Sequence, residues 1–151
     1  MTDRIEKQIL LRAPRSRVWR AIADRGEFGT WFRVALPEGT FAAGEKVKGN
    51  ILHPGYEHMT MEVDVVEVTP ETRLSYRWHP YAIDPAVDYS SEPQTLVTFV
   101  LEDAPDGTLL TITETGFDAI PLHRRDEAFR MNDRGWAGQV KNIERHVTET
   151  R

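Results

Sequence analysis

Hydrophobic residues recur with two different periods in different regions of the chain. Over residues 4–12, and again between residues 45 and 117, apolar and polar side chains alternate, as in strands with one buried face. From Pro121 to Thr148 apolar residues instead recur every three or four positions, which is typical of one face of a long helix. The pattern predicts one strand at the start, a group of strands in the middle and a long helix at the end.

The middle strands follow one another through short turns, which favours antiparallel pairing. In one of them the alternation slips at Val65 and Val66, which indicates a β-bulge. Between the first strand and this group, two short helices are predicted over residues 13–24 and 26–32. The middle strands are predicted over residues 45–52, 59–70, 72–80, 95–103 and 107–117.

Two glycines interrupt the predicted long helix. Gly135 and Gly138 are poor helix formers and cost up to about 1 kcal/mol each. We therefore expect either a kink near Gly135 or a close approach of the helix to a surface beneath it.

The order of elements predicts an α+β fold over a single domain, residues 1–151. A curved antiparallel sheet of about six or seven strands can wrap around one long C-terminal helix, with two short helices after the first strand. One helix fills the concave side of such a sheet only with large side chains. An internal cavity between helix and sheet is therefore expected.

Composition narrows the range of functions. Of 151 residues, 40% are hydrophobic and 28% are charged, the formal net charge is −5, and there is no cysteine. Disulfides and thiolate metal sites are thereby excluded, and the negative charge argues against nucleic acid or an anionic membrane as partner. The N-terminal residues lack the apolar run of a signal peptide, and no segment approaches the roughly 20 apolar residues of a membrane span. We expect a cytoplasmic protein.

The order of these segments resembles the helix-grip superfamily of START and birch-pollen-allergen-like domains, also called SRPBCC. Within it, the chain is similar to the branch named after the activator of heat-shock-protein-90 ATPase. The resemblance covers nearly the whole chain and rests on the segments ILLRAPRSRVWRAIAD, FGTWF, FAAGEKVKG, VTPETRLSYRW, LVTFVLED, GTLLTITETGF and GWAGQVKNIERHV.

The resemblance implies a deep, mostly apolar cavity between the long helix and the sheet. Members of the superfamily bind or process hydrophobic ligands, and some are cyclases or other enzymes. The eukaryotic co-chaperone that names the branch carries a further domain ahead of this one, whereas the present sequence starts at the first strand. A co-chaperone role therefore carries over poorly.

The predicted cavity wall consists of bulky apolar residues with one amide. Aromatic side chains mixed with two methionines suit an adaptable apolar pocket. The alternative is that they form an ordinary packed core. The predicted ligand-binding residues are Phe32 and Phe41 near an entrance, with Met59, Met61, Tyr76, Trp78, Phe99, Leu110, Ile112, Phe129, Asn132 and Trp136 along the wall.

Glu114 is the one carboxylate expected to share a face with this wall. It lies two residues beyond Ile112 and four beyond Leu110 in an alternating strand, so it points inward if they do. A buried carboxylate is a candidate ligand anchor or general acid or base, and Asn132 is its candidate partner from the helix. Alternatively, Glu114 lies at the end of the strand and reaches water or an arginine.

The histidines do not assemble a metal site. His53 and His58 flank a tight turn, but strand parity places them on opposite sides of the sheet, and zinc requires three or four converging ligands. His53 alone is a candidate polar contact at the cavity mouth, whereas His123 and His146 are expected on the helix surface. We find no nucleophile-elbow serine and no glycine-rich phosphate loop, so no metal or nucleotide cofactor is predicted.

Residues 77–95 have no period and join two predicted strands. Loops of this length are uncommon in compact domains unless they are functional or disordered. Three prolines stiffen the segment, and Tyr81 and Tyr89 suit the edge of a pocket. The segment is either a semi-rigid flap at one end of the cavity, a surface loop, or a contact in a homodimer.

Three functions remain open from the sequence. The first is binding of a small apolar molecule in the internal cavity. The second is an enzyme, cyclase-like or hydrolase-like, that uses the same cavity with Glu114 as acid or base, although no positive catalytic motif is present. The third is a stress-related protein interaction of the co-chaperone kind.

Overall fold

One antiparallel sheet spans the molecule. The structure, a computed structural model, describes residues 4–84 and 86–149. Within them, seven strands pair in the order β1-β7-β6-β5-β4-β3-β2, and each neighbouring pair is antiparallel. The strands are β1 Arg4–Leu11, β2 Val34–Ala35, β3 Lys46–Ile51, β4 Thr60–Thr69, β5 Arg73–Trp78, β6 Thr95–Ala104 and β7 Gly107–Thr115.

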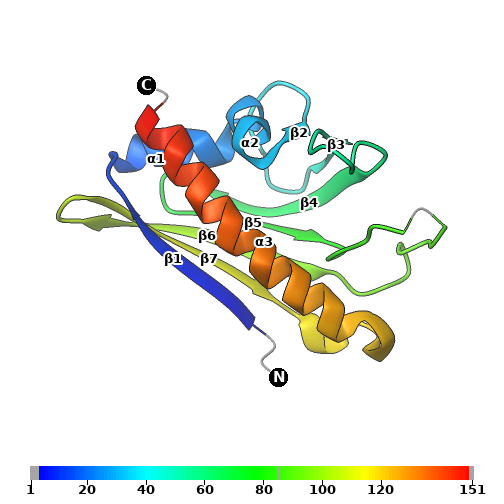
Figure 1. Cartoon of the computed structure of the whole chain (residues 1–151). Helices are drawn as coiled ribbons and strands as arrows, with labels where there is room; N and C mark the ends of the chain where they lie inside the picture. The colour runs from blue at the N-terminus through cyan, green and yellow to red at the C-terminus, as the bar shows by residue number, and fades with distance from the viewer. Residues whose placement is uncertain (1–3, 85, 150–151) are drawn as a thin grey trace.

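A long helix crosses one face of this sheet. Helix α3, Leu122–Glu149, runs diagonally over the strands, and the short helices α1, Arg15–Ala23, and α2, Arg25–Phe32, lie beside its C-terminal end (Figure 1). The short 3₁₀ helix η1, Phe117–Ala119, connects β7 to α3. The structure therefore has two layers, with the sheet on one side and the helices on the other.

Asp24 separates the two short helices. Its side chain accepts hydrogen bonds from the backbone N–H groups of Gly26 and Glu27, at 2.8 and 3.1 Å, and so caps the start of α2. At the other end of α2, Arg33 adopts the left-handed conformation with φ 68° and stops the helix. This short helix positions Phe28, Trp31 and Phe32 toward the core.

The core lies between the sheet and α3. Helix α3 buries Ala128, Trp136, Ile143 and Val147, which follow the three- and four-residue spacing of its sequence. In β7 every second residue from Thr108 to Glu114 is buried, as the alternation predicts. Glu114 is therefore carried into the core by the same periodicity that buries Leu110 and Ile112.

The predicted fold class is confirmed: a curved antiparallel sheet, two short helices after the first strand and one long C-terminal helix. The bulge expected at Val65–Val66 is present, because the pairing of β4 with β5 shifts between Val65 and Glu67. The two-residue strand β2 was not predicted. It is too short to show a period, and it forms by pairing with Ile51 and Asn50 of β3.

One of the two roles predicted for the helix glycines is wrong. Gly135 and Gly138 are exposed, and a Cβ atom added to either would meet nothing within 4 Å. The helix therefore does not approach another surface closely at these glycines. It continues without a break from Leu122 to Glu149.

None of the helices in the described part of the chain is long and apolar enough to cross a membrane.

Candidate functional site

The candidate site is organised around the carboxylate of Glu114. This residue lies in β7, paired with Ile5 of β1 on one side and Val97 of β6 on the other, and it is completely buried. The alternative that it reaches water at the strand end does not hold. A carboxylate in this position must find its hydrogen-bond donors within the protein.

Four side chains supply those donors. The indole N–H of Trp78 and the hydroxyl of Thr95 donate to Oε2 of Glu114, at 2.8 and 2.6 Å. The indole N–H of Trp136 donates to Oε1 at 2.8 Å. The amide of Asn132 donates to both oxygens at 3.0 Å. These bonds bring together β5, β6, β7 and α3 at one point of the core.

The donors of Glu114 are all uncharged. An ionised carboxylate accepts about four hydrogen bonds through its lone pairs, so these groups occupy the carboxylate as acceptor. Two of the donors are indoles, which can only donate and need an acceptor when they are buried. The carboxylate therefore satisfies the two tryptophans as much as they satisfy it.

The two indoles form an aromatic group with Phe32. The rings of Trp78 and Trp136 are 5.9 Å apart at an interplanar angle of 31°. The ring of Phe32 lies 6.1 Å from Trp78 and 6.3 Å from Trp136. Because both indole N–H groups are fixed on one carboxylate, the orientation of the two rings is set by Glu114.

A pocket of about 150 Å³ opens over these rings, beside α3. We call it the indole pocket. Its lining is mainly apolar, with two amide side chains and an exposed glycine. The lining residues are Phe32, Trp78, Met131, Asn132, Gly135, Trp136 and Gln139.

Tyr76 lies deeper in the same region. It is completely buried, its ring is 5.3 Å from that of Trp78, and its hydroxyl has no hydrogen-bond partner among the described residues. Burial, and then the charge of Glu114, raise the pKa of Tyr76 well above its ordinary value.

Aromatic rings pack against one another in the interior, between the short helix α2, the sheet and α3. Phe28, Trp31, Phe99 and Trp136 stack edge to face or tilted, with centroid distances of 4.6 Å for Phe28–Trp31, 6.5 Å for Trp31–Phe99 and 5.8 Å for Phe99–Trp136. Two of these rings, Phe28 and Trp31, come from the short helix α2. The indole pocket lies beside these rings, since Trp136 belongs both to its lining and to the packed group.

The other residues predicted for the cavity wall fall into three groups. Phe41, Met61, Phe99, Leu110 and Ile112 are buried in the core. Phe129 is partly buried and packs on Phe117 at 5.1 Å, nearer the start of α3. Met59 and His53 lie apart from Glu114. Met59 is partly buried just before β4, and His53 is exposed, with its ring 5.6 Å from Tyr56.

Thr95 is a site residue that the sequence pattern did not reveal. It lies at the start of β6, directly opposite Trp78 of β5, and both side chains donate to the same oxygen of Glu114. Only the pairing register of β5 with β6 places the two residues together. The unpatterned residues 79–94 between β5 and β6 hide that register in the sequence.

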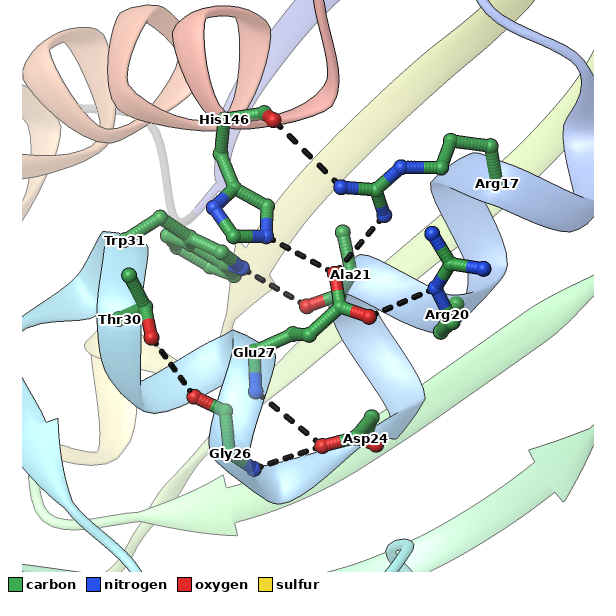
Figure 2. Close-up of polar contacts among 9 residues, drawn as sticks. All are labelled: Arg17, Arg20, Ala21, Asp24, Gly26, Glu27, Thr30, Trp31 and His146. Carbon is green, nitrogen blue, oxygen red and sulfur yellow. Dashed lines mark hydrogen bonds and ion pairs between the residues drawn. The ribbon is translucent and has the colours of Figure 1, made fainter. Parts of the chain in front are cut away.

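A second carboxylate fastens the C-terminal end of α3. Glu27 of α2 accepts hydrogen bonds from Arg17 at 2.8 Å, Arg20 at 2.7 Å and the His146 ring at 2.9 Å (Figure 2). The surface position expected for His146 is wrong, since its side chain is only 8% exposed. Burial opposes ionisation of Glu27, but the bonds from His146 and the two arginines outweigh it and lower the pKa of Glu27 below its ordinary value.

The unpatterned stretch between β5 and β6 is held by Arg124, near the start of α3. The guanidinium donates to the backbone carbonyls of Pro80 and Tyr81, at 2.9 and 3.3 Å, and to the carboxylate of Glu92 at 2.8 Å. It also lies 4.8 Å from the ring centre of Tyr89. One side chain of the helix thus contacts the loop at four points.

Among the described residues, no group of three or more His, Asp or Glu side chains is arranged to hold a metal ion.

The fold and the buried site define the class of protein: a helix-grip domain, in which one long C-terminal helix lies against a curved antiparallel sheet. A family model described as "Activator of Hsp90 ATPase homolog 1-like protein" matches residues 12–148, and the chain belongs to that family. No curated protein matches the sequence.

Solved structures share the fold at low sequence identity. Protein MLL2253 from Mesorhizobium loti has a TM-score of 0.76 and 22% identity, and the match covers 98% of each chain. The Aha1 dimer from Colwellia psychrerythraea has a TM-score of 0.71 and 14% identity, over 97% of this chain and 96% of that one. DynU16, from the dynemicin biosynthetic locus, has a TM-score of 0.74 and 22% identity, over 99% of this chain and 48% of that one. At these identities the likeness concerns the fold.

Proposed function

We propose that the protein binds a small, mainly apolar molecule in the indole pocket, between Phe32, Trp78 and α3. One observation carries this proposal. A buried carboxylate with four uncharged donors holds two indole rings in fixed orientation directly behind an apolar pocket. Membership in a helix-grip family supports it, since ligands of this superfamily bind between helix and sheet.

The dimensions of the pocket indicate the size of the ligand. An apolar cavity of about 150 Å³ is large enough for benzene, and the indole pocket has a volume of about 150 Å³. The rings of Phe32, Trp78 and Trp136 favour offset or edge-to-face contact with another ring. The proposed ligand therefore has one aromatic or cyclic apolar group, with a polar group that can reach Asn132 or Gln139 at the rim.

Glu114 acts in this proposal as a positioning residue. Both carboxylate oxygens already accept hydrogen bonds from protein donors, and Glu114 itself is not among the residues that line the pocket. This geometry favours a role in fixing the indoles over a role as acid or base. The enzymatic alternative has no specific observation of its own.

The experiment fills the pocket without disturbing the fold. Gly135 lines the indole pocket, and a Cβ atom added there meets nothing within 4 Å. Gly138 is equally exposed and lies on the same helix but outside the pocket. We expect ¹⁹F NMR of fluorobenzene to show binding by the wild type and by Gly138→Leu, and a loss of at least about tenfold in Gly135→Leu.

Equal binding by the two variants would remove the indole pocket as the site, and no binding by the wild type would contradict the proposal itself. Native mass spectrometry of the purified protein, followed by solvent extraction, would then identify any natural ligand that copurifies.

We also propose that the protein is cytoplasmic and that it forms a homodimer. Fractionation of cells tests the first, and sedimentation of the purified protein tests the second. A chaperone contact is the remaining alternative, and a pull-down from cell extract addresses it.

A further inference from the structure

A second and larger cavity lies between the loop that follows β5 and the first turns of α3. Its volume is about 410 Å³, and it shares no lining residue with the indole pocket. We call it the loop pocket. Its lining residues are Tyr81, Ile83, Asp84, Val87, Tyr89, Glu92, His123, Arg124 and Glu127.

Several polar contacts hold the wall of the loop pocket. Arg124, with its side chain 11% exposed, is paired with Glu92 at 2.7 Å and bonded to the carbonyls of Pro80 and Tyr81. The hydroxyl of Tyr89 accepts a hydrogen bond from the backbone N–H of Asp84 at 3.1 Å. Tyr81 is held at φ 51°, a left-handed conformation that costs a non-glycine residue of the order of 1 kcal/mol and persists only where its surroundings fix it.

The charges around the pocket are predominantly negative. Three carboxylates line it, from Asp84, Glu92 and Glu127, against one guanidinium. Because Arg124 pairs with Glu92, no guanidinium of the pocket wall balances the negative charges of Asp84 and Glu127. Burial, then the charge of Glu127, raise the pKa of Tyr81 above its ordinary value, while Arg130 acts in the opposite and smaller sense. Among the charges that act on Tyr81, that of Glu127 has the largest effect.

The remaining wall is apolar and aromatic. Ile83 and Val87 contribute aliphatic surface, and Tyr81 and Tyr89 contribute rings. The ring of Tyr89 already has a cation against it, the Arg124 guanidinium at 4.8 Å. Aromatic faces with nearby carboxylates are the surroundings that favour an organic ammonium group.

We infer that the loop pocket is a second binding site, for a small organic ammonium compound with an apolar body. The apolar part lies against Ile83 and Val87, and the ammonium group lies between the tyrosine rings and the carboxylates of Asp84 and Glu127. An anionic ligand is disfavoured, because the one guanidinium in the wall is already paired. This inference is independent of the function proposed for the indole pocket.

The test uses phenethylammonium as the probe, with 2-phenylethanol as a neutral compound of nearly the same shape. Titration calorimetry of the full chain should give a Kd for the ammonium compound at least about tenfold lower than for the alcohol. Glu127→Gln should weaken phenethylammonium binding about three- to tenfold. Asp126→Asn, which removes the same charge from the neighbouring exposed residue outside the pocket, should leave it within about twofold.

The location of the bound probe is checked by NMR, through backbone amide shifts on addition of phenethylammonium. Shifts are expected near Tyr81, Tyr89 and Glu127, and Gly135→Leu should bind the probe as the wild type does, which separates this site from the indole pocket. Equal affinity for the alcohol, unchanged binding by Glu127→Gln, or shifts centred on Trp136 would each overturn the inference.

Discussion

Helix α3 is anchored by two carboxylates that differ in every respect except their role as acceptors. Glu114 is completely buried, and its donors are two indoles, a hydroxyl and an amide, all uncharged. Glu27, with its side chain 23% exposed, receives two arginines and a histidine. The first arrangement fixes aromatic rings, and the second fastens the end of the helix to α1 and α2.

The difference shows how the burial of a carboxylate determines whether its hydrogen-bond donors are neutral or charged. An ion pair in the core must overcome the desolvation of two charges, which often exceeds the Coulomb attraction. When a carboxylate is buried among neutral donors, only one charge is removed from water. The carboxylate also satisfies several donors that would otherwise be buried without acceptors. Near the surface, where desolvation is incomplete, arginine partners cost less. The loss in free energy of unfolding should therefore differ between the two clusters, both in size and in its dependence on pH.

The largest effect is expected from Glu114→Ala. This change leaves the N–H groups of Trp78 and Trp136, with Thr95 and Asn132, without their common acceptor. We expect the free energy of unfolding to fall by at least about 3 kcal/mol, because each buried donor without a partner costs about 1–3 kcal/mol. Urea unfolding followed by tryptophan fluorescence measures it.

The control for this prediction is Glu102→Ala, at an exposed position of β6, which should change the free energy of unfolding by less than about 0.5 kcal/mol. Similar losses for the two variants would show that the buried hydrogen bonds contribute little.

A smaller effect is expected from Glu27→Gln. The variant removes the charge that Arg17, Arg20 and His146 share, and at neutral pH we expect a loss of about 1–2 kcal/mol, since part of the group is screened by solvent. Urea unfolding of both proteins across a pH series measures the difference.

The pH dependence of that difference has a definite sign. The folded-state pKa of Glu27 lies below its ordinary value of 4.5, so its stabilising contribution is fully present above pH 4.5. The contribution is lost as the pH falls through the lowered pKa, because the carboxylate is then protonated in both states. Stability curves of wild type and Glu27→Gln that stay parallel through this range would contradict the assignment.

The smallest effect concerns the helix between the two carboxylates. Gly138 is exposed within α3, and a methyl group added there meets nothing within 4 Å. Gly138→Ala should raise the free energy of unfolding by about 0.5–1 kcal/mol, through helix propensity alone. Thermal unfolding followed by circular dichroism detects it as a higher Tm, and an unchanged or lower Tm would indicate a contact of Gly138 that the structure does not show.

The sequence was sufficient for the fold and for part of the candidate site. Alternation placed Glu114 on the face of Leu110 and Ile112, and helical spacing placed Trp136 and Asn132 on one side of α3. These periodicities depend only on backbone geometry, so they can be recognised in the sequence without knowing which segments pack together.

What the sequence left open depends on contacts between distant segments. The role of Thr95 follows from its pairing with Trp78, and the buried position of His146 follows from the docking of α2 on the end of α3. The same holds for the interior: composition gives the number of aromatic residues, but only the structure shows that Phe28 and Trp31 pack against each other.

The two indoles fixed on Glu114 also have an optical consequence. Their rings lie 5.9 Å apart at 31°, each with its N–H end tethered to the same carboxylate, so their electronic transitions are coupled at a set angle. Such a pair gives a chiral signal in the near-ultraviolet that responds to small rotations of either ring. The protein thus carries a built-in chromophore, through which any molecule that parts or tilts the rings can be followed without a label.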